Sequence, residues 1–189
     1  MTKKLYYFLS AAATVYTLWY MHFEKPWTNA GALSTVGLKH RALFAVWGTL
    51  TFLALSLGVT LVFRTLYNTK VYIPLLALSA VGMALTLACR FDYRYHTEYL
   101  LHCGGSLAFS AAMGTTVFLA FLLGFRRHLL MKLFTFNTAA VLLSDIVLLC
   151  CLKETALIET LPVFTAYIML GITVRRSDLF ETARKAATA

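Results

Sequence analysis

The chain has 189 residues, of which 60% are hydrophobic and only 13% are charged, and its formal net charge is +9. An average soluble domain is about a quarter charged, so a water-soluble fold of this size could not cover so much apolar surface. The basic residues stand in short clusters between apolar runs, without the aromatic and basic surface that binds nucleic acid, so no nucleic-acid partner is expected. The composition therefore predicts an all-α, polytopic membrane protein.

Six apolar runs are each about long enough to cross the hydrocarbon core of a bilayer, which takes about 20 mostly apolar residues. In chain order they cover residues 5–21, 42–63, 71–89, 100–125, 133–152 and 155–174. Helices are expected because backbone groups in hydrocarbon must bond within their own segment. Glu159 and Pro162 weaken the last run. We predict a single transmembrane domain over residues 1–189, a six-helix bundle that ends in a short basic tail at 175–189.

The distribution of lysine and arginine predicts the orientation, because cytoplasmic loops are richer in both. With a cytoplasmic N-terminus, the inner side carries Lys3, Lys4, Arg64, Lys70, Arg126, Arg127, Lys132, Arg175, Arg176, Arg184 and Lys185. The outer side then carries only Lys25, Lys39, Arg41, Arg90, Arg94 and Lys153. Both termini are therefore predicted on the cytoplasmic side of the cell (inner or plasma) membrane.

The longest connection, residues 22–41, is polar and is predicted to lie on the outer side. Long loops in compact bundles often carry function or act as lids. This loop could fold over the polar stretch at residues 90–102, or it could be a plain interfacial connector.

That polar stretch holds two acid–imidazole pairs, Asp92 with His96 and Glu98 with His102, each four residues apart and so on one face of a helix. A carboxylate that orients an imidazole suits a general base or a metal ligand. At about 100° per residue, however, the pairs lie about 120° apart, so one straight helix cannot converge them. A metal site on His96 and His102 would need a turn or another ligand such as His40. The alternative is a solvated turn, and neither a metal nor a cofactor is our first expectation.

Asp145 stands inside the fifth run, where a carboxylate costs several kcal/mol unless it is paired or protonated. It must therefore face the bundle. Asn137 and Ser144 share a stripe with Asp145 at its edge. This stripe predicts either a polar pocket, with a proton- or ion-coupled role, or an interhelical hydrogen bond. The candidate partners of Asp145 are His102, Arg90, Arg41 and Thr49.

Small residues recur every fourth position in the fourth run, at Gly104, Ala108 and Ala112. This spacing lets neighbouring helices approach closely in lipid, and we expect it to serve helix packing. The same faces could serve a second copy of the chain or another membrane partner.

Two stretches, "NAGALSTVGLKHRALFAVWGTLTFL" and "LLHCGGSLAF", resemble the bacterial relatives of the DRAM/FRAG-like group of small six-helix membrane proteins. The resemblance is carried by Ser34 and Gly37 before the second long helix and by His102 at the start of the fourth. It implies a membrane-embedded, lipid-related role and no particular reaction.

We expect an outward-facing polar pocket walled by Asp92, His96, Glu98, His102, Asp145 and part of the loop at 22–41. Such a protein would bind, handle or transport a lipid headgroup or a small solute, with membrane lipids as its partners. Two alternatives stay open. One is a membrane-embedded hydrolase that uses a carboxylate-oriented histidine, with or without a metal. The other is a regulatory or assembly subunit of a membrane complex.

Overall fold

The computed structural model describes residues 2–126 and 128–177, and all regular secondary structure in these residues is helical. The six long helices are α1 (Thr2–Tyr20), α3 (Arg41–Val62), α4 (Ile73–Ala88), α5 (His96–Leu122), α6 (Leu129–Leu152) and α7 (Ala156–Arg175). A π-helical turn, η3 (Phe63–Tyr67), extends α3. The all-α prediction is confirmed, and each predicted apolar run corresponds to one long helix. The predicted tail from residue 178 onward lies outside the described residues.

Within residues 2–126 and 128–177, four segments are long and apolar enough to cross a membrane: α3 together with η3, α5, α6 and α7. The apolar helix α4 is shorter, with 16 residues. Large apolar side chains cover the outside of the bundle, and Phe8, Leu107, Phe136 and Ile168 are each 63–71% exposed. An outer surface of this kind is what lipid, in place of water, would contact.

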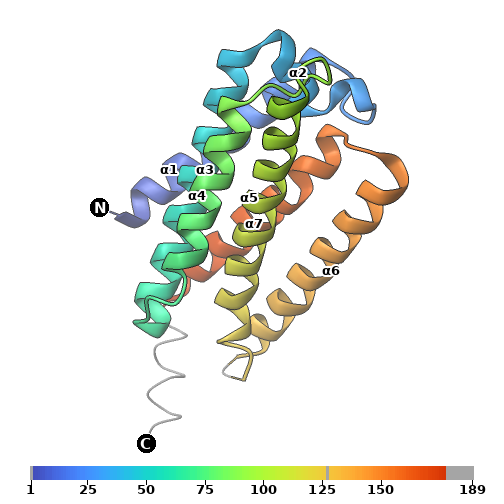
Figure 1. Ribbon diagram of the computed structural model, residues 1–189. Helices are drawn as coiled ribbons and strands as arrows, with labels where there is room; N and C mark the ends of the chain where they lie inside the picture. Colours follow the sequence, from blue (N-terminus) through green and yellow to red (C-terminus); the bar gives the residue numbers. More distant parts are fainter. Residues whose placement is uncertain (1, 127, 178–189) are drawn as a thin grey trace, which may run out of the picture.

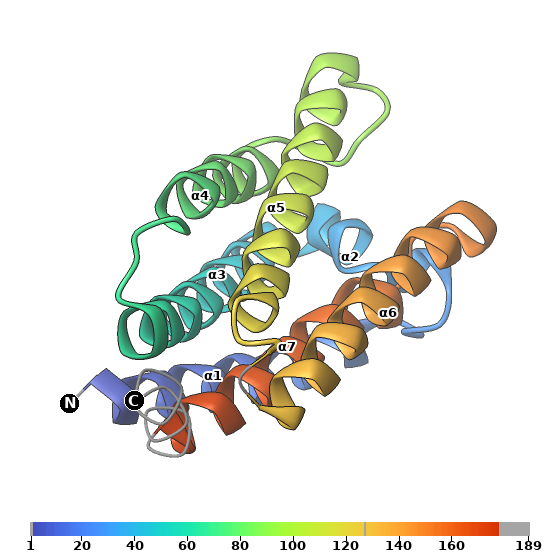
Figure 2. The same cartoon turned by 90° about the horizontal axis from the view of Figure 1, so that it is seen from below.

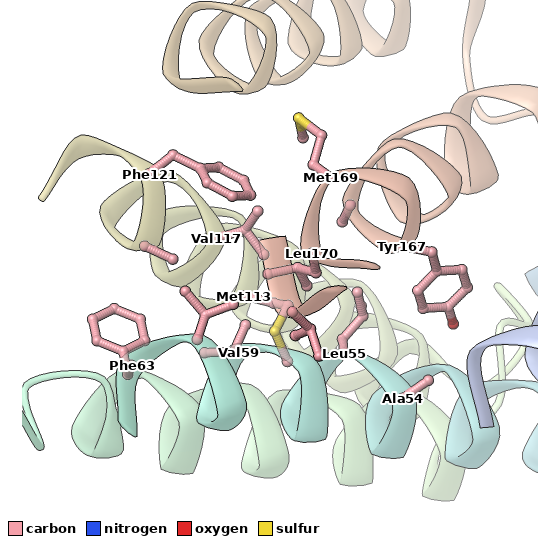
Figure 3. Packing of buried hydrophobic residues seen from close by; sticks show 14 of the residues in the cluster. Ala54, Leu55, Val59, Phe63, Met113, Val117, Phe121, Tyr167, Met169 and Leu170 are labelled. Carbon is pink, nitrogen blue, oxygen red and sulfur yellow. The ribbon is translucent and has the colours of Figure 1, made fainter. Parts of the chain in front are cut away.

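Helix α3 is the centre of the packing, with α1 and α7 against one side and α4 and α5 against another (Figures 1 and 2). The main core lies where α3, α5 and α7 meet (Figure 3). Val59 of α3, Val117 and Phe121 of α5, and Leu170 of α7 are each at most 3% exposed. This core fixes the three helices that form much of the site described below.

The closest helix contact joins α4 to α5 through two glycines. A Cβ atom added to Gly82 would lie 2.7 Å from the Gly105 carbonyl oxygen, and one added to Gly105 would lie 2.7 Å from the Gly82 carbonyl oxygen. Gly104, predicted as a packing residue with Ala108 and Ala112, is exposed and would place its Cβ in open space. That prediction is wrong for Gly104 within this chain: Ala112 is buried, but Gly105 makes the contact.

The connection between α1 and α3, predicted as a loop at residues 22–41, is largely folded. It contains two 3-10 turns, η1 (Met21–Phe23) and η2 (Asn29–Gly31), and the short helix α2 (Leu33–Lys39), which packs on α3. Asn29 Nδ2 donates to the Glu154 carbonyl at 3.0 Å, and the Leu157 N–H donates to the Pro26 carbonyl at 3.3 Å. These bonds tie the loop to the junction between α6 and α7, whereas one sequence-based alternative placed it over residues 90–102.

The described ends of the chain meet at the end of the bundle opposite α2. Lys3 Nζ donates to Ser177 Oγ at 2.8 Å, which joins the start of α1 to the end of α7. Tyr6, one turn further into α1, donates its hydroxyl to the Tyr167 carbonyl of α7 at 3.1 Å. The two ends of the described chain therefore lie on the same side of the bundle.

Candidate functional site

A cavity of about 230 Å³ lies among α3, α5, α6 and α7 in the half of the bundle next to α2. Most of its wall is apolar, formed by residues such as Phe44, Trp47, Val117, Leu142 and Met169. Its polar and ionisable lining residues are Ser34, Thr86, His102, Cys103, Ser106, Ser110, Thr138, Asp145, Glu154, Glu159 and Thr165. An apolar pocket with a few polar groups is the usual form of a small-molecule site.

The cavity opens sideways between α5 and α6. Leu107 and Leu149 line it and are still 71% and 39% exposed, and Ser110 is exposed as well. Figure 1 shows α6 diverging from α5 toward the C-terminal end of α6. The buried residues of α6 are Met131, Thr135 and Thr138, all in its first ten positions. The second half of α6 is thus a cavity wall and not a part of the core.

Helix α2 borders the cavity through Ser34, and Glu159 of α7 holds α2 in place. Its carboxylate accepts from the Leu33 N–H and, at 2.8 Å, from the Ser34 hydroxyl. The first N–H groups of a helix lack partners within the helix. Since Ala32 at the N-cap of α2 has no side-chain acceptor, the Glu159 carboxylate takes over that role.

Glu154 lies in the turn between α6 and α7. Lys153, before it, has a left-handed backbone with φ of 63°, and Thr155, after it, caps α7 by accepting from the Ile158 N–H. This turn places the Glu154 side chain against the cavity, where its Oε2 atom is buried without a hydrogen-bond partner in the described chain. Burial raises the pKa of the Glu154 carboxyl above its usual range, although the nearby Ser34 hydroxyl acts in the opposite direction.

Asp145 also lines the cavity, seven residues before the end of α6 and so about 10 Å deeper along that helix. Its Oδ1 atom is buried and has no hydrogen-bond partner among the described residues. Two predicted partners are engaged elsewhere, since Arg41 donates to the Ala88 carbonyl and Arg90 pairs with Glu98. Asp145 Oδ1 therefore does not form the predicted interhelical hydrogen bond.

The acid–imidazole pairs predicted at residues 92–102 do not form. Asp92 precedes α5 and pairs with Arg94 at 2.7 Å, which lowers the pKa of the Asp92 carboxyl. Glu98 lies 3.7 Å from the Arg90 guanidinium. An adjacent arginine offers each carboxylate a full positive charge, which a neutral imidazole does not. His96, the first residue of α5, is exposed.

His102 is buried and lines the cavity, and its Nδ1 lies 3.2 Å from the Cys89 carbonyl. A carbonyl only accepts, so Nδ1 carries the proton in this bond. The ring also stacks on Phe44, with 5.9 Å between centroids. The hydrolase hypothesis requires a histidine oriented by a carboxylate, and His102 is instead oriented by a backbone carbonyl.

The remaining predicted residues lie away from the cavity. His40 packs on Phe23 at 4.8 Å, and Ser144 is exposed on α6. Asn137 donates to Met169 Sδ at 3.4 Å and borders a separate shallow hollow. In residues 2–126 and 128–177, no three His, Cys, Asp or Glu side chains are grouped so as to hold a metal ion.

The structure thus brings together Ser34, His102 and Asp145 from the predicted set, and it adds Glu154 and Glu159. Comparison of the chain with protein-family models, with curated proteins and with solved structures finds no match.

Proposed function

We propose that this protein spans a cell membrane with α1 and α3–α7, both ends cytoplasmic, and binds an amphipathic molecule that enters its cavity from the lipid. The observation that supports this proposal best is the form of the cavity. Its walls are mostly apolar, Ser34, Glu154 and Glu159 make it polar next to α2, and its side opening lies between α5 and α6.

Two further features favour the membrane arrangement. Four helical segments meet the length and hydropathy of a membrane span, and α1 and α4 pack along α3 and α5, respectively. The Lys3–Ser177 contact brings both described ends of the chain to one side, as an even number of spans requires. That side carries the clusters of lysine and arginine, which are typical of a cytoplasmic face.

The cavity geometry favours a ligand with two unlike parts. Its polar part would lie near Ser34 and Glu154, and its apolar part would extend toward Leu107 and Leu149 at the side opening. Lipids and related amphiphiles have this form. The proposed resemblance to the DRAM/FRAG-like group is consistent with such a role, because Ser34 and His102, two of the three residues that carry it, line the cavity.

The proposal is tested by measuring what remains bound after purification from membranes. Ser110→Phe places a ring in the side opening, and Ser144→Phe is a matched control, because Ser144 is exposed on α6 away from the cavity. Native mass spectrometry should detect a bound amphiphile in the wild type and in Ser144→Phe and much less in Ser110→Phe. Equal amounts in all three proteins, or a protein that is soluble without detergent, would refute the proposal.

A further inference from the structure

The acidic residues of this chain divide into two groups according to their partners. Among the described residues, the three acids outside the cavity all have a basic partner: Glu24 with Lys39, Asp92 with Arg94, and Glu98 with Arg90. The three that line the cavity, Asp145, Glu154 and Glu159, have none of the described lysines or arginines within ion-pair distance.

This difference does not come from a shortage of bases, because the chain has 17 lysines and arginines against eight acids. In the described chain, no lysine or arginine lines the cavity. A buried carboxyl without a partner is costly, more so in a membrane, and persists where it has a use. We therefore expect a ligand to supply the partner that these carboxyls lack.

The three carboxyls are not equivalent. Glu159 already accepts from the Leu33 N–H and the Ser34 hydroxyl, so it has a structural task. Asp145 Oδ1 and Glu154 Oε2 are both buried and both lack a hydrogen-bond partner in residues 2–126 and 128–177. Both oxygens belong to carboxyl groups that line the cavity, one on α6 and one in the turn after it, so these carboxyls are the acceptors left for a bound molecule.

The rest of the cavity suits a compact apolar body. A cavity of about 150 Å³ lined by apolar side chains holds a benzene molecule, and this one measures about 230 Å³. Phe44 and Trp47 line it and stack on each other with 5.5 Å between ring centroids. Aromatic faces of this kind attract positively charged nitrogen groups.

We propose that the cavity binds an organic cation, whose apolar body lies between α5 and α6 and whose positively charged nitrogen group lies between the Asp145 and Glu154 carboxyls. This inference rests on the proposed function and adds the charge of the ligand to it. The net charge of +9 works against unspecific binding of cations, so a cation that binds does so through local acceptors.

The test uses two compounds of nearly the same shape and different charge, benzyltrimethylammonium and neopentylbenzene. The readout is the fluorescence of Trp47 in the full-length protein in detergent, with Trp19 and Trp27, which do not line the cavity, replaced by phenylalanine. Any signal that persists in Ser110→Phe measures partition into the detergent. We expect the cation to bind at least about tenfold more tightly than its neutral counterpart.

Matched variants then locate the charge. Asp145→Asn and Glu154→Gln should each weaken binding of the cation by about tenfold or more. Asp92→Asn and Glu98→Gln, which make the same chemical changes at acids outside the cavity, should leave it unchanged. The comparison of the two compounds needs only the fluorescent reporter protein, so it decides the question even if an acid variant does not fold.

Two outcomes separate this inference from the proposed function. If the two compounds bind equally well, or neither binds, while the amphiphile that Ser110→Phe removes is present in the wild type, the ligand is not a cation and the lipid-accessible site stands. If Ser110→Phe changes neither the bound amphiphile nor the fluorescence response, the proposed function fails and this inference fails with it.

Discussion

Replacing Gly105 by alanine should destabilise the protein, whereas the same change at the neighbouring Gly104 should not. A Cβ at Gly105 would lie 2.7 Å from the Gly82 carbonyl oxygen and 2.9 Å from the Thr86 amide nitrogen, and ordinary contact begins near 3.4 Å. Both obstacles are backbone atoms of α4, so that helix must move by about 0.7 Å as a whole. Overpacking of this kind costs about 1–3 kcal/mol.

Gly104→Ala is the matched control, because nothing lies within 4 Å of its added Cβ. Both variants gain roughly 1 kcal/mol of helix propensity, so their difference, about 1–3 kcal/mol in the free energy of unfolding, isolates the steric effect. For a chain of this length, each kcal/mol shifts Tm by roughly 2–4 °C. Thermal unfolding of both variants in one detergent, followed by circular dichroism, measures it. A Gly105→Ala protein as stable as Gly104→Ala would refute the close approach of α4 and α5.

Two other predictions concern the end of the cavity next to α2. The folded protein holds the Glu154 proton more tightly than the unfolded chain does, so stability should fall as pH rises above the ordinary glutamate pKa toward the raised value. In thermal unfolding measured as a function of pH, Glu154→Gln should therefore lose less stability than the wild type as the pH rises, with Asp145 and Glu159 unchanged in both proteins. The same pH profile in both proteins would contradict the burial of Glu154. Ser34→Ala removes a donor to Glu159 and should cost about 1–2 kcal/mol of unfolding free energy, whereas the exposed Ser144→Ala should cost almost nothing. Equal losses in the two variants would show that the contact between α2 and α7 is not stabilising.

The long helices could be predicted from sequence because apolar length is a strong, local signal. The short helix α2 could not, since its seven residues lie in a polar loop and one of its N-terminal donors is satisfied by Glu159, 126 positions away in sequence. The predicted packing face of α5 is wrong by one residue for a related reason. Gly104 and Gly105 are adjacent and equally small, and only the position of Gly82 on α4 distinguishes them.

The candidate site was predictable in part. A carboxylate inside an apolar run must face the protein, which predicts a pocket position for Asp145, and Asp145 does line the cavity. The same reasoning applies to Glu159, which also stands inside an apolar run, although from sequence it is interpreted only as a feature that weakens its helix. Glu154 gave no such signal, because it follows the fifth run in a turn. The prediction of acid–imidazole pairs at residues 92–102 is wrong because Arg94 and Arg90 are the partners of Asp92 and Glu98.

Because α6 is attached to the bundle mainly through its first ten residues, the residues that shape the ligand site differ from those that stabilise the fold. The distal half of this helix contributes to the shape and charge of a ligand site while the packing that maintains the fold lies mainly among α1, α3, α4, α5 and α7. Sequence changes at Val141, Leu142 or Leu149 can therefore alter which molecules are accepted without a large penalty in folding. Related chains with the same bundle could on this basis differ in ligand preference mainly through substitutions in one half-helix.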